Sequence, residues 1–383
     1  MIRRLYHAIG ILLLASGLGA SGDQLTWDSD ANKQNGATDG SAIWDQNQNN
    51  KVWFTGTADQ KWNNAQLDDA IFGAGGVAGI VTLGENIIAR TLTFNATASG
   101  TYALAGPFTL TLSTGVSAGP GNITNYQSAT IGTVISGLNQ LTKWGGDTLT
   151  LTAANTYSGN TTINQGSLRL NNVTGSGTGT GNVIINAGGM LMGSGSLSGS
   201  VTLNRSAAIS AGNSVGTLTT GGQNWNPGGY DIFEINDVDA GAGLGWDFLN
   251  INGPLAINAT LTDKFTLDVR SLTLANTPGS VHDFDNNLSY AWTLASATSG
   301  ISFASGQNES TVFNLILGQF SNGLGGGNFS VGVANGNKDL VLQFTPAPEP
   351  GTCLLLGLGA AAFFWRIRRP PPSRPGTSVT RSS

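Results

Sequence analysis

Short segments in which apolar and polar residues alternate recur along most of this chain. Each is three to five residues long and is bounded by Gly, Asn or Ser. The segments are 80–83, 91–94, 108–112, 149–152, 167–170, 184–186, 201–203 and 249–252. A period of two places one face of a β-strand in a core and the other in water. Threonine at the polar positions adds strand propensity, so the pattern predicts an all-β chain of many short strands.

Strands this short are stable only when they stack on neighbours. A parallel β-solenoid meets this need, because each coil pairs with the previous one and turns at Gly and Asn. We therefore expect a right-handed parallel β-solenoid (β-helix) over residues 79–345. Coils of roughly 20 residues would give on the order of 13 of them. One or two β-sandwiches remain the alternative.

Two regions differ from this pattern in their aromatic content or in the length of their expected strands. Residues 23–78 contain four of the nine tryptophans, Trp27, Trp44, Trp53 and Trp62, separated by polar turns. We expect a Trp-rich N-terminal cap in which large rings cover the open end of the first coil; stacking on sugar rings is the alternative. In 225–345 the expected strands are longer and more aromatic, as in 290–294 and 340–344, which fits wider coils or a capping sheet.

The first 20 residues have the order of a secretory signal peptide. The basic pair Arg3 and Arg4 precedes an apolar run over 8–14 and then small residues over 15–22. We expect cleavage near Ala20. The remaining chain would then lie outside the cytoplasm.

The C-terminal segment also has the features of a targeting signal. Pro348, Glu349 and Pro350 precede an apolar run over 353–365, which predicts a single short hydrophobic helix. This run has 13 residues, whereas a spanning helix needs roughly 20, so we expect transient anchoring in the inner membrane. Basic residues follow and would stop transfer, and 370–383 would form a disordered basic tail. The stop-transfer residues are Arg366, Arg368 and Arg369.

Charge and cysteine content narrow the classes of function. Residues 21–345 carry a net charge of −11, which argues against binding nucleic acid. The single cysteine, Cys353, lies in the apolar C-terminal run. The body therefore has no disulfide framework and no thiol nucleophile.

Two resemblances support these interpretations. Residues 346–369, with Pro348-Glu349-Pro350, the apolar run and the arginines, resemble the PEP-CTERM sorting signal of Gram-negative bacteria. This resemblance implies an exosortase-type membrane peptidase as a partner. Residues 141–170, from Leu141-Thr142-Lys143-Trp144-Gly145-Gly146 to Gln165-Gly166-Ser167-Leu168-Arg169-Leu170, resemble the autotransporter-associated β-strand repeat.

The repeat can also be interpreted from its residues alone. We expect the corners at Gly145-Gly146 and Ser158-Gly159. The apolar residues of the strands would stack inward: Leu149, Leu151, Ile163, Leu168 and Leu170.

Catalytic chemistry finds little support in the sequence. Once the signal peptide is removed, His282 is the one histidine that remains. The candidate carboxylate pairs for a glycosidase are Asp68 with Asp69, Asp237 with Asp239, and Asp283 with Asp285. The basic residues that could bind a substrate are scattered singly: Arg90, Arg169, Arg205, Arg270, Lys143, Lys264 and Lys338.

Metal binding is equally weak as a hypothesis. Residues 242–250 fit a calcium nonapeptide once, with one substitution, whereas such sites need tandem copies. Asp247 more simply closes a turn. We therefore predict no catalytic residues, no metal and no cofactor.

The sequence thus predicts an exported, non-enzymatic, structural or adhesin-like protein of the cell surface or extracellular matrix. Its partners would be the exosortase-type peptidase, the membrane through the C-terminal segment, and an extracellular polysaccharide. A carbohydrate-active β-helix enzyme and a carbohydrate-binding module remain the alternatives.

Overall fold

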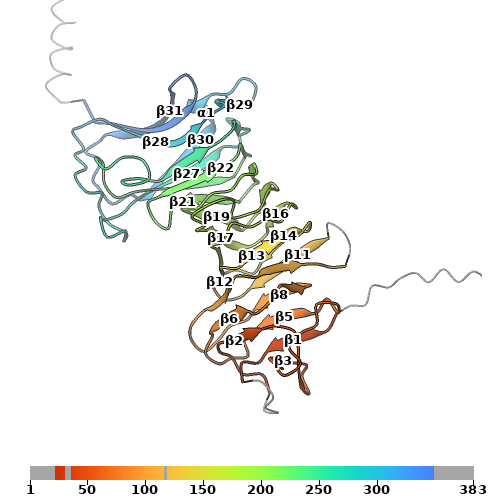
Figure 1. Ribbon diagram of the computed structural model, residues 1–383. Coiled ribbons are helices and arrows are strands. Elements are labelled where there is room, and N and C mark those ends of the chain that lie inside the picture. The colour runs from red at the N-terminus through yellow and green to blue at the C-terminus, as the bar shows by residue number, and fades with distance from the viewer. Residues whose placement is uncertain (1–21, 31–35, 116–118, 349–383) are drawn as a thin grey trace, which may run out of the picture.

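A computed structural model describes residues 22–30, 36–115 and 119–348 of the chain. These residues form 32 β-strands and one short helix, α1 (Glu309–Val312). Most strands pair in parallel with the strand one coil further along the chain, so the coils stack into a rod (Figure 1). The expected all-β chain with stacked parallel sheets is confirmed.

The first side of the rod is a 13-stranded sheet. Eleven of its strands are parallel and come from successive coils, while β3 and β4 add an antiparallel hairpin at the N-terminal end. The strands are β1 (Gln24–Trp27), β3 (Trp53–Phe54), β4 (Asp59–Gln60), β5 (Asp69–Phe72), β8 (Thr91–Phe94), β11 (Pro120–Asn125), β14 (Gln140–Trp144), β16 (Thr161–Ile163), β18 (Val183–Ile185), β20 (Val201–Leu203), β23 (Gln223–Trp225), β26 (Leu255–Ile257) and β29 (Ile301–Phe303).

The second side is an 11-stranded sheet that is parallel throughout. The strands are β2 (Ala42–Trp44), β6 (Ile80–Leu83), β9 (Tyr102–Ala105), β12 (Ala129–Ile131), β15 (Thr148–Leu151), β17 (Gly166–Leu170), β19 (Gly189–Gly193), β21 (Ala208–Ala211), β24 (Tyr230–Ile235), β27 (Phe265–Ser271) and β30 (Phe313–Gln319).

The third side is interrupted in its middle. One three-stranded sheet holds β7 (Ile87–Ala89), β10 (Thr109–Leu112) and β13 (Val134–Ser136). A five-stranded sheet holds β22 (Thr217–Thr220), β25 (Phe248–Ile251), β28 (Tyr290–Ala297), β32 (Asp339–Thr345) and β31 (Asn328–Ala334). Between the two sheets, backbone hydrogen bonds still join neighbouring coils, as from Thr156 N to Ile135 O at 2.9 Å.

The C-terminal end of the rod has both features expected for residues 225–345, wider coils and a capping sheet. The coils widen, because β27 has seven residues and β28 has eight. A capping sheet then follows, since β32 pairs antiparallel with β28 and β31 pairs antiparallel with β32.

Coil length varies more than we expected. Val183 pairs with Val201, only 18 residues on, whereas Leu255 pairs with Ile301, 46 residues on. The estimate of about 13 coils over residues 79–345 was therefore too high: nine of the eleven parallel strands of the first side lie in this range. Long loops in the later coils take up residues that a uniform repeat would have placed in strands.

The parallel stack begins inside the tryptophan-rich segment. Strand β1 pairs in parallel with β5, and β2 pairs in parallel with β6. This segment therefore contributes the first coil as well as the antiparallel strands beside it. The hydrophobic helix expected over 353–365 lies outside the described residues. Within the described ranges, no helix has the length and apolar character needed to cross a membrane.

Candidate functional site

Residues 141–170 bury the apolar residues that the sequence placed inward. Strands β14 and β15 belong to one coil, β16 and β17 stack on them in the next, and the core side chains of all four are 0–2% exposed. The prediction of inward stacking is confirmed for Leu149, Leu151, Ile163, Leu168 and Leu170.

The third side of the coil that contains β14 and β15 has a polar interior in place of a strand. Asn155 is 5% exposed; its Oδ1 accepts from Ile135 N at 2.8 Å and its Nδ2 donates to Gly177 O at 2.6 Å. One side chain thereby joins the coil before it to the coil after it. Tyr157 is also buried, and its hydroxyl lies 2.6 Å from Thr161 Oγ1. These bonds satisfy backbone and hydroxyl groups that burial would otherwise leave without partners.

Lys143 lies in the core, contrary to its treatment as a residue that could bind a substrate. It is 0% exposed and occupies an inward position between Ile123 and Ile163. Its Nζ donates to the carbonyl oxygens of Gly145 at 2.7 Å and Gln165 at 2.8 Å. Burial lowers its pKa to about 8, an effect that the nearby charge of Asp147 opposes.

The corners of the repeat lie where the glycines predicted them. Gly145 has a φ of +84°, and a Cβ atom there would lie 2.1 Å from Asn125 O. A Cβ on Gly159 would lie 2.4 Å from Asn139 O. Only a residue without a side chain fits this close between coils.

A row of asparagines runs along one edge of the 13-stranded sheet. We call it the asparagine ladder. It comprises Asn164, Asn186, Asn204, Asn226 and Asn258, each directly after the strand of its coil. From Asn186 onward, each Nδ2 donates to the Oδ1 of the asparagine one coil nearer the N-terminus, at 2.7, 2.9, 3.1 and 3.0 Å in chain order. We did not predict this ladder from the sequence, although an asparagine directly follows the inward apolar residue that ends each of these strands.

The four early tryptophans form a buried aromatic cluster, which we call the tryptophan cap. Trp27, Trp44, Trp53 and Trp62 are each 0% exposed. Ring centroids lie 4.8 Å apart for Trp53 and Trp62, and 4.9 Å apart for Trp44 and Trp53. Phe72 of the next coil lies against three of these rings. Because their faces are covered, the rings cover the end of the core rather than stacking on a sugar.

The carboxylate pair Asp68 and Asp69 has a structural role. Asp69 forms an ion pair with Arg90 at 2.6 Å. Asp68 accepts from Asp23 N at 2.8 Å, and burial raises its pKa. Neither carboxylate lines a described cavity.

The other two carboxylate pairs stabilise turns. Asp237 Oδ1 accepts from the backbone N of Asp239 at 2.9 Å. Asp285 Oδ1 accepts from the backbone N two residues further on, also at 2.9 Å. His282 lies 3.1 Å from Asp283, and both side chains are about half exposed. These are local polar contacts rather than a converging site.

Asp247 is buried and bridges two coils. Its Oδ1 accepts from Gly216 N and its Oδ2 from Glu234 N, both at 3.0 Å. Burial raises its pKa well above the usual value, and the charge of Glu234 adds to that rise. In the described part of the chain, no three acidic, histidine or cysteine residues are placed to hold a metal ion.

One charged group was not anticipated. On the outer face of the 11-stranded sheet, Arg270 pairs with Glu234 across the strands and donates to Asp268 Oδ2 at 2.6 and 2.9 Å. Burial raises the pKa of Glu234, and Arg270 opposes that rise. The three residues do not line any cavity described below. An ion pair within a wide coil, in which two Arg270 nitrogens share one oxygen of Asp268, accounts for them.

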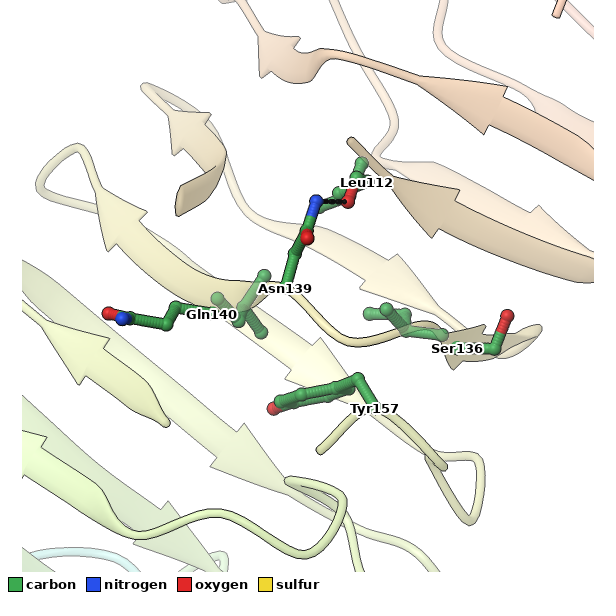
Figure 2. A pocket seen from close by; sticks show the side chains of 7 residues that line it. Leu112, Ser136, Asn139, Gln140 and Tyr157 are labelled. Carbon is green, nitrogen blue, oxygen red and sulfur yellow. Dashed lines mark hydrogen bonds between the residues drawn. The ribbon is translucent and has the colours of Figure 1, made fainter. Parts of the chain in front are cut away.

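Three cavities among the described residues lack a histidine and a pair of carboxylates. The cavity between the third-side loops, at Leu112, Asn139 and Tyr157, has a volume of about 10 Å³ (Figure 2). That is room for about one water molecule. Asn139 lies on its wall and donates to Leu112 O at 2.6 Å.

Two larger hollows lie near the C-terminal end. One, of about 210 Å³, is lined by residues of α1, β30 and β31, including Glu309 and Phe329. The other, of about 350 Å³, is lined by Tyr290, Phe344 and their neighbours. Neither lining contains a histidine or a pair of carboxylates, so acid–base catalysis has no evident partners there.

The sorting residues lie almost entirely outside the described ranges. Pro348 is the last described residue and is exposed after β32. Glu349, Pro350, Arg366, Arg368 and Arg369 lie outside, as does Ala20 near the expected cleavage point.

Comparison with known families gives two matches. The passenger-associated-transport-repeat matches residues 141–170, and the PEP-CTERM protein-sorting motif matches residues 346–369. The chain carries both elements. The repeat covers the coil that contains Lys143 and Asn155 and the first two strands of the next coil. Both resemblances inferred from the sequence are confirmed.

One curated relative shares more than the repeat. The chain is 39% identical over 212 residues to a protein described as "Adhesin BmaC autotransporter", from Brucella suis biovar 1 (strain 1330). The match covers 54% of this chain and 6% of that protein. The chain therefore spans a small fraction of the length of this relative.

Proposed function

We propose that this protein is an exported structural protein of the cell surface or extracellular matrix, with an adhesin-like and non-enzymatic role. The observation that carries the proposal is a stacked-coil rod that holds a passenger-type repeat and is followed by a sorting motif. The relative described as an adhesin supports the same role. Arg90, Arg205 and Arg270 each pair with a carboxylate of the rod, and this favours a structural over a catalytic function.

The proposed route uses both ends of the chain. Residues 1–20 would direct secretion and be cleaved near Ala20. An exosortase-type peptidase would recognise Pro348, Glu349 and Pro350 while the apolar run 353–365 holds the chain in the inner membrane. The arginines that follow would remain on the cytoplasmic side. The cap (23–78) and the solenoid (79–345) would then reach the surface; we propose right-handed winding because crossovers between parallel strands are almost always right-handed.

Mass spectrometry of the native protein from cell fractions tests this route. We expect a surface or released form that starts near Ala20 and ends near Pro348. A Glu349→Gln chain should accumulate unprocessed in the inner membrane, whereas Glu309→Gln, outside the motif, should be processed normally. Recovery of the full chain to Ser383 in the inner membrane of cells that contain the peptidase would overturn the proposal.

A further inference from the structure

The outer face of the 13-stranded sheet has a composition unlike the rest of the rod. From β11 to β26, no outward position and no asparagine of the ladder carries a charge. Most of these positions are Thr or Asn; the exceptions are Pro120, Gln140, Trp144, Ile184 and Ala256. The outer face of the 11-stranded sheet, in contrast, carries Arg169 and the group around Arg270. An uncharged face several coils long stands out on a body with a net charge of −11.

The asparagine ladder leaves hydrogen-bonding groups available along this face. Each side-chain amide has two N–H donors and an oxygen with two lone pairs. A ladder bond uses one donor of one residue and one lone pair of the next, so a donor and a lone pair remain at each coil. The side chains are partly exposed. Their orientation is fixed by the ladder, so binding would cost little conformational entropy.

Trp144 lies at the N-terminal end of the ladder. It pairs with Thr124 of the preceding coil. It lies level with Asn164 of the next coil, because Lys143 and Ile163, the residues directly before these two, are paired. Its side chain is 45% exposed, whereas the four rings of the tryptophan cap are 0% exposed. A large exposed aromatic ring beside a polar row points to a binding surface rather than to the core.

We propose that this face binds a neutral polysaccharide whose chain lies along the rod axis. Strands in a sheet are about 4.8 Å apart, so hydroxyl and amide groups recur at a fixed interval, as do the hydroxyls of a linear sugar polymer. The Trp144 ring would pack against the apolar face of one sugar. The nearby cation Arg205 is ion-paired with Asp263, so an acidic polymer would meet a negative body without a free positive partner on this face.

This inference rests on the proposed surface role and can fail separately from it. The test uses the secreted protein as recovered from cells and measures retention on a neutral β-glucan and on agarose, with polygalacturonate as the acidic comparison. We expect retention on at least one neutral polymer and little on the acidic one. Trp144→Ala should weaken binding about tenfold or more, as loss of a central aromatic contact does.

The coil that contains β14 and β15 offers a matched control. Thr142→Glu places a charge on the outer face of the 13-stranded sheet, and Thr150→Glu places the same charge in the same coil on the 11-stranded sheet. We expect Thr142→Glu to abolish retention and Thr150→Glu to leave it unchanged, with the same circular dichroism in both. Equal retention of the two variants, no retention of the wild type, or equal binding to polygalacturonate would each overturn the inference. A dimer that Thr142→Glu disrupts would do so too, because a second copy would then occupy the face.

The termini of these variants separate the two proposals. If Trp144→Ala chains are processed near Pro348 and reach the surface, the sorting proposal stands whether or not the polymer binds. Loss of processing in the wild type would instead contradict the proposed function. The retention measurements would still decide the binding proposal, because they do not depend on processing.

Discussion

Gly145 and Gly146 are adjacent in one corner of the repeat but differ in what they tolerate. Gly145 has a positive φ and would place a Cβ 2.1 Å from Asn125 O, whereas the nearest atom to a Cβ on Gly146 is 4.0 Å away. We predict that Gly145→Ala lowers the free energy of unfolding by about 2 kcal/mol or more. Gly146→Ala should change it by less than about 1 kcal/mol. Urea unfolding of both variants checks this; equal losses would contradict it.

The buried Lys143 makes stability depend on pH in a defined direction. Its pKa falls from 10.5 to about 8 on folding because burial disfavours the charge. Between these two values the unfolded chain holds a proton that the folded chain has released, so the free energy of unfolding rises with pH over this window. The contribution is about 3 kcal/mol.

Lys143→Met provides the comparison, because it removes this titration and keeps an apolar stem in the core. Other groups titrate in both proteins and cancel in the difference. Denaturant unfolding from pH 7 to pH 11 should therefore show the wild type gaining about 3 kcal/mol on the variant. Profiles that stay parallel would mean that the Lys143 pKa is not lowered in the folded protein.

At the scale of the element, the alternation of apolar and polar residues was enough to predict strands. The segments 80–83, 91–94 and 201–203 match β6, β8 and β20. Alternation is a local property, set within one strand. The asparagine ladder was missed because it depends on register between coils, and the burial of Lys143 because a charged residue occupies the inward position two residues after Leu141. Register could not be inferred, since the separation of residues paired in parallel ranges from 18 to 49.

The ladder should act as a connected element rather than as independent residues. Asn186 and Asn204 each take part in two ladder bonds and share one of them. At about 1 kcal/mol for each bond, either change to alanine should cost about 2 kcal/mol. The double variant loses three bonds, so it should cost about 1 kcal/mol less than the sum. Asn224→Ala, in another column of the same sheet, should instead add to Asn186→Ala without coupling. Chemical denaturation of the wild type, the three single variants and the two double variants measures this.

At the scale of the whole molecule, the rod is a stack in which each coil contacts its neighbours. Stability in such a stack is approximately a sum of coil and interface terms. The two ends then matter most, because an uncovered coil exposes its core and its strand edges. The tryptophan cap covers one end and the antiparallel strands β31 and β32 lie at the other. The sequence predicted the cap because four large rings in a short segment need a buried surface.

Removing one ring of the cap should therefore have a local effect. Trp53 is 0% exposed and contacts Trp27, Trp44 and Trp62, so Trp53→Ala should cost the first coils about 3–5 kcal/mol. Hydrogen exchange read by mass spectrometry should show loss of protection over 24–94 while 141–203 keeps its protection, because few contacts connect these parts directly. Trp144→Ala, which removes an exposed ring, should leave both regions protected. Loss of protection along the whole rod would show that it unfolds as one cooperative unit and not coil by coil from the cap.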